Sequence, residues 1–297
     1  MKYLSLFSGI GGFELGIKAK CVGYSEIDKY AIQIYQKHFP KHRNHGNATT
    51  IDATKLPDFD LLVGGFPCQS FSIAGKRGGF NDTRGTLFFD IARILKEKRP
   101  RNFILENVKG LLSHDNGQTF KTIITTLTEL GYCVEWQVLN SKNFGVPQNR
   151  ERVFIIGYFG EQPSRKVFPI REPDEIYTRP SEVKEEIHAG TLTARQFASW
   201  NGNYIKQLNN PTHSNNRIYG TDGLSPTINT MQGGNRQPFI QTDIRIRKLT
   251  PLECERLQGF PDNWTEIVSD SQRYKCLGNA VTVNVIKYLM ELLISNK

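Results

Sequence analysis

The first 160 residues alternate short apolar runs with segments whose apolar positions recur at a helical spacing. Short apolar runs bounded by Gly, Pro and Asn are typical of buried strands. Strands that alternate with helices along the chain are typical of a parallel sheet with crossover helices. The pattern predicts strands at residues 3–7, 21–25, 61–66, 102–105, 132–139 and 153–158.

Three segments carry apolar residues three or four positions apart, which places these residues on one face of an α-helix. The first two, at 87–95 and 120–127, lie between predicted strands. The third carries a continuous stripe of Val and Leu between residues 281 and 293. Because such a stripe needs an apolar surface to cover it, we expect residues 276–297 to pack against the domain that contains the predicted N-terminal strands.

Residues 163–238 have a different character, since Pro, Asn, Gly, Thr and Gln dominate and only short β-like pieces appear, at 217–219 and 227–230. A polar segment of this length is also compatible with disorder. It nevertheless contains residues for a modest core, namely Phe197, Trp200, Tyr204, Ile205, Tyr219, Ile228 and Phe239. We therefore expect a first domain at 1–175, a smaller loop-rich domain at 176–250 and a hinge at 251–275.

Charge and composition narrow the choice of partner. The 297 residues contain 38 Lys and Arg against 29 Asp and Glu, which gives a formal net charge of +9. This excess is compatible with a polyanionic partner and equally with an ordinary basic protein. No run approaches the roughly 18 apolar residues of a membrane span. Residues 8–12 also interrupt the apolar start before a signal peptide forms, so we expect a cytoplasmic protein with no membrane partner.

The cysteines and histidines do not form a pattern typical of a metal site. The five cysteines are widely spaced and contain no C-x-x-C pair, which argues against a disulfide framework or a zinc site. His38, His42 and His45 are interleaved with basic residues and have no Cys or acid nearby. We therefore expect a solvated loop there and no bound metal.

A glycine turn separates the first predicted strand from the helix that follows it. Residues 8–12 read Ser-Gly-Ile-Gly-Gly, so the backbone there is free to approach a ligand closely. The dinucleotide fingerprint fails because Glu14 occupies its third glycine position. Glu26 ends the second strand, where a carboxylate accepts hydrogen bonds from the hydroxyl groups of a ribose. Such pairs are common in α/β proteins, and this one favours a nucleoside ligand without a pyrophosphate.

Two further strand ends carry reactive side chains. Cys68 follows the strand at 61–66 on a rigid Pro67 turn, and Glu106 ends the next strand. A lone cysteine is more often an inert buried residue, but an acid on the same sheet edge makes a nucleophilic role for Cys68 more plausible.

A thiolate, an acid and a nucleoside pocket together fit one reaction. A thiolate that adds to carbon 6 of a pyrimidine makes carbon 5 able to attack an electrophilic methyl group. The ring accepts the thiolate only when nitrogen 3 receives a proton or hydrogen bond.

Arg150 and Arg152 supply planar donors for a carbonyl oxygen or a phosphate, although an ion-paired surface would have the same sequence.

Together these residues resemble the ordered motifs of DNA cytosine-5 methyltransferases of the small bacterial and phage restriction-modification type. Residues 7–12 resemble the first motif, 67–69 the nucleophile motif and 106–108 the acid motif. Residues 148–152 resemble the Q-x-R-x-R element, and the ninth and last motifs match 247–253 and 278–281. The resemblance covers nearly the whole chain. It implies an α/β fold, with a Rossmann-like S-adenosylmethionine-dependent methyltransferase sheet, helices on both faces and a small loop-rich β target-recognition domain at 176–250.

The resemblance also implies a role for each matched residue. The catalytic residues are Cys68 as nucleophile, Glu106 at cytosine nitrogen 3, and Arg150 and Arg152 as supports for the base and the catalytic loop. The S-adenosyl-L-methionine site is expected to contain Phe7, Gly9, Gly11, Glu26, Ile27, Asp52, Pro67, Leu87, Asn279 and Val281. Duplex DNA is expected to contact Gln69, Ser72, Lys76 and Arg77, in a loop at 69–83 that closes on DNA, and Arg217, Thr227, Gly233 and Gly234 in the recognition domain.

Three other functions compete with this interpretation. A tRNA cytosine-5 methyltransferase shares the architecture, although a recognition region of roughly 80 residues favours DNA, since direct base readout needs a dedicated module. A DNA-binding regulator without catalysis is disfavoured by the intact Cys68, Glu106 and Arg152 set. A nicotinamide oxidoreductase is disfavoured by the failed third glycine. We expect a monomer that acts on duplex DNA beside a cognate restriction endonuclease.

Overall fold

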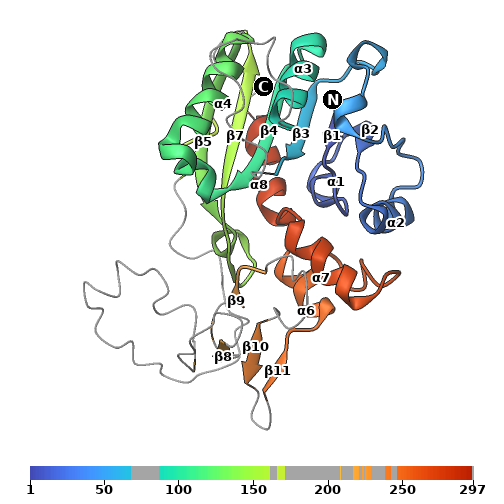
Figure 1. Ribbon diagram of the computed structural model, residues 1–297, viewed down its shortest axis with the longest axis vertical. Coiled ribbons are helices and arrows are strands. Elements are labelled where there is room, and N and C mark those ends of the chain that lie inside the picture. The colour runs from blue at the N-terminus through green and yellow to red at the C-terminus, as the bar shows by residue number, and fades with distance from the viewer. Residues whose placement is uncertain are drawn as a thin grey trace. The chain divides into compact units, whose positions relative to one another are not determined.

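The computed structural model describes residues 1–67, 87–160, 166–170, 208, 217–220, 223, 225–228, 238–241 and 246–295 (Figure 1). The chain forms two compact units. The sheet unit consists of Met1–Leu139, Glu151–Arg171 and Ile286–Lys297, and the second unit of Asn140–Arg150 and Glu172–Val285. The boundaries expected at 175, 250 and 275 differ from this division. Segment 140–150 joins the second unit through contacts such as Gln148 Nε2 to Leu257 O at 3.1 Å.

The sheet unit is built on a six-stranded sheet with the order β2-β1-β3-β4-β7-β5. Its strands coincide with the six predicted apolar runs, which confirms those predictions within a few residues. β1 pairs in parallel with β2 and β3, and β3 pairs in parallel with β4. The strand bounds are β1 Lys2–Leu6, β2 Lys20–Ser25, β3 Leu61–Gly65, β4 Asn102–Val108, β5 Tyr132–Asn140 and β7 Glu151–Phe159.

The predicted parallel sheet is confirmed for β1, β2, β3 and β4, and β7 departs from it. This strand lies antiparallel to β4, with Asn102 opposite Tyr158 and Val108 opposite Arg152. A parallel return requires a crossover of a dozen or more residues, usually a helix. The connection from β5 to β7 contains only the short 3₁₀ helix Ser141–Phe144 and the two-residue strand β6, Gln148–Asn149. The sheet is therefore mixed.

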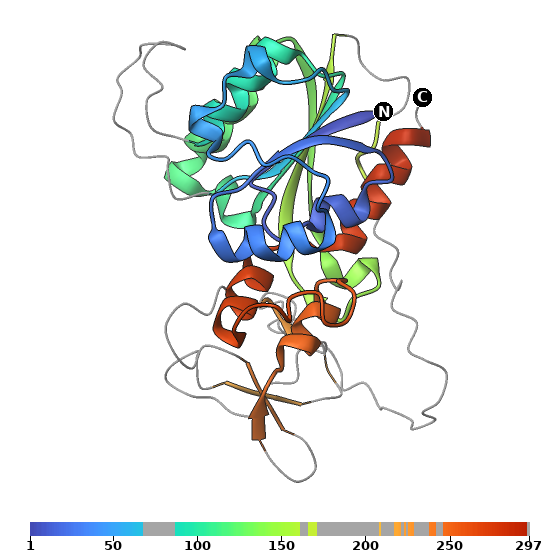
Figure 2. The same cartoon turned by 90° about the vertical axis from the view of Figure 1, so that its right-hand side faces the viewer.

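Helices cover both faces of the sheet (Figure 2). α3 (Leu87–Lys98) and α4 (Gln118–Glu129) confirm the two predicted amphipathic helices, and their apolar sides join one buried core with β1, β3 and β4. α1 (Gly12–Gly16) lies on the other face, where α8 (Val283–Ser295) contacts it between Ile286 and Gly16. In α8 the predicted stripe is buried at Val285, Leu289 and Leu293, while Val281 precedes the helix. α2 (Lys29–His38) follows β2.

The described part of the second unit contains two small sheets, the helices α6 (Pro251–Leu257) and α7 (Asp270–Asn279), the 3₁₀ helix Ser141–Phe144 and the start of α8. Strands β11 (Ile246–Lys248), β10 (Phe239–Gln241) and β8 (Ile218–Gly220) form one sheet, and β6 pairs in parallel with β9 (Ser225–Pro226). The β-like piece at 217–219 corresponds to β8, whereas the piece expected at 227–230 is displaced, because Thr227 and Ile228 follow β9. The expected hinge instead contains the capped helix α6 and the start of α7.

One helical segment, Asp270–Ser295, is long and apolar enough to cross a membrane by length and composition alone, which the sequence analysis did not anticipate. The segment comprises α7 and α8, and 61% of its apolar window is buried inside the protein. The core helix of a globular domain is buried in the same way.

Candidate active site

Glu106 lies at the carboxyl end of β4, beside the end of β3 that leads to the predicted nucleophile. Gly65 is the register partner of Glu106 in the parallel β3–β4 pair. A Cβ at Gly65 would lie 3.0 Å from Glu106 Oε2, which is tighter than most real contacts, so glycine leaves room for the carboxyl group. Cys68 lies outside the described residues. Pro67, which precedes it, is exposed.

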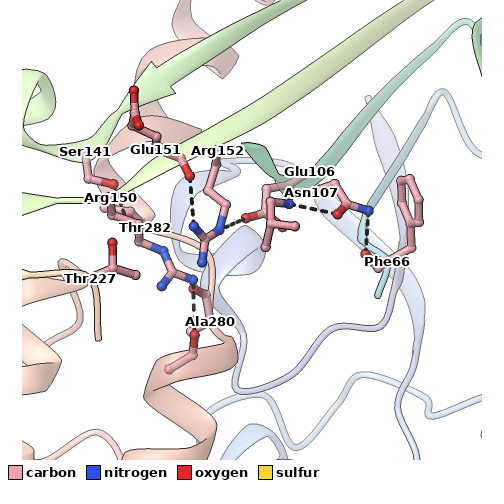
Figure 3. A network of polar contacts seen from close by, with 12 residues as sticks. Phe66, Glu106, Asn107, Ser141, Arg150, Glu151, Arg152, Thr227, Ala280 and Thr282 are labelled. Atoms are coloured by element: carbon pink, nitrogen blue, oxygen red, sulfur yellow. Dashed lines mark hydrogen bonds and ion pairs between the residues drawn. The ribbon is translucent and has the colours of Figure 1, made fainter. Parts of the chain in front are cut away.

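An ion pair orients the Glu106 carboxyl group (Figure 3). Arg152 Nε lies 3.1 Å from Glu106 Oε1, and the two side chains are only 16% and 12% exposed, respectively. Arg152 Nη1 also donates to Glu151 O at 2.8 Å, so the guanidinium is held at two points. Because an ion pair this buried is poorly screened by water, it fixes the carboxyl orientation more firmly than a surface pair would.

Asn107 ties β4 to the segment that enters the nucleophile motif. It is 2% exposed, and its Nδ2 donates to Phe66 O at 2.8 Å. Its Oδ1 accepts from Val108 N at 2.8 Å, so the amide cannot rotate without breaking a bond. The sequence analysis assigned Asn107 no role of its own. Its place next to Glu106 in the matched motif was the available signal.

The predicted cofactor turn adopts the unusual backbone that its glycines allow. Gly9 and Gly11 have φ angles of +55° and +90°, and Phe7 has +53°. An added Cβ at Gly11 would lie 2.6 Å from the Phe39 ring, whereas at Gly9 it would meet nothing within 4 Å. Gly9 N donates to Glu26 Oε2 at 2.8 Å, which links the turn to the end of β2.

Glu26 keeps room for a ligand although it already binds the backbone. Its Oε1 accepts from Ile27 N and Asp28 N, both at 2.8 Å, in addition to the bond from Gly9 N. An ionised carboxylate accepts about four hydrogen bonds, so roughly one position remains. The neighbouring Ile27 side chain is 69% exposed, a large apolar surface in water.

Asp52 lies in an exposed turn that Arg93 holds in place. Asp52 Oδ1 accepts from Thr54 N and Thr54 Oγ1, and these bonds together with Lys55 lower the pKa of the carboxyl group. Arg93 of α3 donates to Ala48 O at 2.9 Å and to Ile51 O at 2.6 Å, just before Asp52. The sequence analysis missed Arg93, because nothing in the sequence indicates a contact 42 residues away.

Arg150 is buried among main-chain carbonyls of the second unit. It is 2% exposed, and its guanidinium donates to the main-chain carbonyls of Ile228, Gly278 and Ala280 at 3.2, 3.1 and 2.8 Å within the second unit. Figure 3 shows the bond to Ala280. These bonds hold the backbone that flanks Asn279. The structure therefore places Arg150 in a buried position beside the last motif, and its expected contact with the base stays a prediction.

The remaining predicted residues divide into three groups. Leu87 is half-buried at the start of α3, while Asn279 is exposed and Val281 buried in the second unit. Arg217 is exposed before β8, and Thr227 Oγ1 donates to Asn149 O at 2.8 Å. The third group lies outside the described residues and comprises Gln69, Ser72, Lys76, Arg77, Gly233 and Gly234. The aromatic residues expected between 197 and 205 also lie outside the described residues.

The histidines at 38–45 correct the expectation of a solvated loop. His42 is half-buried, and its Nδ1 lies 3.0 Å from Tyr35 Oη. His45 is also half-buried, against Gly23. Among the residues that the structure describes, no three His, Cys, Asp or Glu side chains are grouped so that they could hold a metal ion.

Comparison with known families agrees with this geometry. The family model described as C-5 cytosine-specific DNA methylase matches residues 1–295. The chain belongs to this family. The type II methyltransferase M1.ScrFI of Lactococcus lactis subsp. cremoris is 44% identical, over 98% of this chain and 77% of the relative. M.HhaI of Haemophilus parahaemolyticus is 37% identical, over 97% of this chain and 93% of the relative.

Solved structures support the fold of this methylase. The crystal structure of S. pombe Dnmt2 methyltransferase superimposes with a TM-score of 0.73 at 22% identity, and covers 99% of this chain and 98% of that one. A putative DNA modification methyltransferase encoded within an E. coli prophage gives 0.67 at 20% identity. At these identities the similarity establishes the fold alone.

Methylases of this family use S-adenosylmethionine, and the described residues fit such a ligand. Open space faces Gly9 where a side chain would otherwise stand, and Glu26 retains acceptor capacity for a ribose hydroxyl. The exposed Ile27 provides an apolar surface for a planar base, and Asp52 provides an acceptor for an exocyclic amine.

Proposed function

We propose that this methylase modifies carbon 5 of a cytosine within a short specific sequence of duplex DNA, with Cys68 as nucleophile and Glu106 as the group that meets nitrogen 3. The observation that carries the assignment is the Glu106 carboxyl group, held by Arg152 at 3.1 Å beside the end of the strand that leads to Cys68. A second carboxylate, Glu26, stands at the glycine turn of the same sheet.

In this mechanism the Cys68 thiolate forms a bond to carbon 6 of the cytosine. The electrons of the carbon 5–carbon 6 double bond move toward nitrogen 3, where Glu106 supplies a proton or hydrogen bond. Carbon 5 thereby becomes nucleophilic and would take the electrophilic methyl group that a bound cofactor would supply, as the bond from that methyl group to sulfur breaks and leaves its electron pair on sulfur. Loss of the carbon 5 proton to a solvent base then restores the double bond and expels the Cys68 thiolate, and the proton at nitrogen 3 returns to Glu106.

A thiolate at a strand end cannot reach a base that is stacked in a duplex. The target cytosine must therefore leave the helix, at a cost of a few kcal/mol. Gln69, Ser72, Lys76 and Arg77 follow Cys68 in sequence and are proposed to contact the DNA around the flipped base. The net charge of +9 favours association with a polyanion.

The cofactor contacts are assigned residue by residue. Glu26 binds the ribose, Phe7 and Ile27 lie against the adenine, and Asp52 accepts from its amino group. The glycines at 9 and 11 allow close approach of the backbone. The other proposed contacts are Pro67, Leu87, Asn279 and Val281.

Specificity and partners complete the proposal. Arg217, Thr227, Gly233 and Gly234 read the target, with Arg217 bonded to a guanine edge. The relatives are named as type II methyltransferases, which supports a restriction-modification role beside a cognate endonuclease. We propose a cytoplasmic monomer with no membrane partner.

The test uses labelled S-adenosylmethionine with duplex DNA or tRNA, followed by bisulfite sequencing of plasmid from cells that express each variant. Wild type should label DNA alone, at one sequence. Cys68→Ala and Glu106→Gln should abolish or strongly reduce transfer while cofactor affinity stays near wild type. Duplex DNA with 5-fluorocytosine at the target should trap wild type covalently, because the fluorine blocks the final proton loss, and should not trap Cys68→Ala. Transfer to tRNA alone, or a wild-type rate for Cys68→Ala, would contradict the proposal.

A further inference from the structure

A buried carboxyl group lies two residues beyond the glycine turn, and the mechanism above does not use it. Glu14 of α1 is 5% exposed. Its Oε1 accepts a hydrogen bond from Tyr35 Oη at 3.0 Å, and its Oε2 is buried with no hydrogen bond in the described part of the chain. A buried carboxylate with so few partners is costly, whereas a neutral carboxyl group is tolerated.

Tyr35 links Glu14 to a histidine beyond α2. Tyr35 Oη lies 3.0 Å from His42 Nδ1 as well as 3.0 Å from Glu14 Oε1. A phenol has one proton to donate, so when Tyr35 donates to Glu14, the bond with His42 requires a proton on Nδ1. The three side chains therefore form one hydrogen-bonded chain from α1 to the loop after α2.

The same aromatic cluster contacts the glycine turn directly. Phe39 lies so close to Gly11 that an added Cβ would be 2.6 Å from its ring. Phe39 stacks on His42, with ring centroids 5.1 Å apart, and lies 5.0 Å from the Tyr35 ring. α1 contains only five residues, which is too short to be stable without tertiary contacts. Contacts from α2, from the loop after it and from α8 therefore position α1, and of these contacts Phe39 reaches Gly11.

We propose that Glu14 is a positioning residue for the cofactor turn, and that its neutral carboxyl group, bonded to Tyr35, holds α1 and Gly11 in the arrangement that binds S-adenosylmethionine. This inference rests on the proposed cofactor contacts of the turn. The affinity of the turn for the cofactor would then depend on pH, although residues 8–12 of the turn carry no titratable side chain.

Burial raises the pKa of Glu14 toward neutral pH and shifts the pKa values of its titratable neighbours away from it. The groups around Glu14 are Tyr3 and Ser5 from β1, Cys21 and Tyr24 from β2, Tyr35 from α2 and His42 from the next loop, while α8 contributes the apolar Ile286 at Gly16. Burial raises the pKa of Glu14 to about 7, although Ser5, the Glu14 backbone and Tyr35 favour the charged form. Burial lowers the pKa of His42 and raises the pKa of Cys21 to about 11.

The direction of the effect follows from this order. Below pH 7 the Glu14 carboxyl group is neutral, and burying it costs little. Above pH 7 it is a buried negative charge that accepts the Tyr35 hydrogen bond through one of its oxygens. If only the neutral form binds, the cofactor Kd rises about tenfold between pH 6 and pH 8.

The test measures the S-adenosylmethionine Kd by calorimetry, without DNA, at pH 6, 7 and 8. Wild type should weaken about tenfold over this range, and Glu14→Gln, which stays neutral and still accepts from Tyr35, should bind with a flat profile near the wild-type value at pH 6. Glu97→Gln makes the same change at an exposed position of α3 and should follow wild type. Equal slopes for wild type and Glu14→Gln would overturn the inference.

Two further variants keep the result interpretable. Tyr35→Phe removes a bond that favours charged Glu14, so the rise in Kd should begin at a higher pH, and an unmoved profile would count against the hydrogen-bonded chain. Glu26→Ala should weaken binding by a similar factor at every pH. Unchanged affinity in Glu26→Ala would contradict the proposed cofactor contacts and the inference together. Weakened affinity with equal slopes in Glu14→Gln would overturn the inference alone.

Discussion

Replacing Asn107 by Ala tests whether a buried amide positions the nucleophile segment. The change removes the bond from Nδ2 to Phe66 O and the bond from Val108 N to Oδ1, both 2.8 Å long. Phe66 is 3% exposed, so its carbonyl does not readily gain a water in exchange. Each lost bond costs on the order of 1 kcal/mol, and a buried carbonyl without a partner costs about 1–3 kcal/mol. We expect the free energy of unfolding to fall by roughly 3 kcal/mol.

The expected effect on methyl transfer is larger than this loss of stability explains. Phe66 lies two residues before Cys68, so a shift in its carbonyl moves the nucleophile. A displacement of about 1 Å at a reacting group lowers a rate about 100-fold. Single-turnover transfer to duplex DNA at saturating cofactor measures this rate directly, and urea unfolding measures the stability of the same preparation.

Tyr132→Phe is the matched control. It also removes a buried bond to a main-chain carbonyl, from Tyr132 Oη to Pro100 O at 3.0 Å, but Pro100 precedes β4 at the end opposite Glu106. We expect a loss of about 1–2 kcal/mol in stability with an unchanged rate. If Asn107→Ala transferred methyl groups as fast as Tyr132→Phe, the positioning role of Asn107 would be wrong.

Three further predictions have defined outcomes. Gly65→Ala places a Cβ about 3.0 Å from Glu106 Oε2. The methyl-transfer rate should therefore fall roughly tenfold, with the cofactor Kd unchanged. In the control variant Gly110→Ala the added Cβ meets nothing within 4 Å, so the rate should stay unchanged. Arg150→Met removes the donors to three carbonyls and should cost roughly 3 kcal/mol or more in urea unfolding; a loss below about 1 kcal/mol would contradict the buried role. The pKa of Glu14 in the folded protein, about 7, exceeds the ordinary 4.5. Wild type should therefore lose stability relative to Glu14→Gln as the pH rises from 5 to 7, by about 1.4 kcal/mol per pH unit at most. Parallel plots of unfolding free energy against pH for the two proteins would refute this prediction.

The inner strands β1, β3, β4 and β7 could be predicted because they are largely buried, and burial on both faces leaves continuous apolar runs in the sequence. Strand direction could not be predicted, since a run such as 153–158 is equally apolar in either orientation. The direction of β7 depends on how the chain returns from β5, and a connection of 3₁₀ helix and short strand has no periodic pattern to reveal it.

Site residues could be predicted where their role depends on position along the chain. Glu26 and Glu106 both end strands, and parallel strands bring such ends to one edge. Arg93, Tyr35 and His42 act through partners that the fold alone supplies. Arg93 bonds to carbonyls 42 and 45 residues away, and Tyr35 meets Glu14 across 21 residues.

Arg150 and Arg152 show why two residues of one motif need separate arguments. Residues two positions apart in a continuous strand point to the same side, so the motif suggests a shared role. The chain breaks that continuity at Arg150, which lies between β6 and β7, while Arg152 lies within β7 opposite Val108. Arg152 consequently reaches the Glu106 carboxyl group, which we propose meets the substrate. Arg150 is surrounded by main-chain carbonyls, and a guanidinium with several rigid donors satisfies several carbonyls at once, as a lysine cannot. The same residue type is therefore required at both positions for unrelated physical reasons, one electrostatic and one architectural.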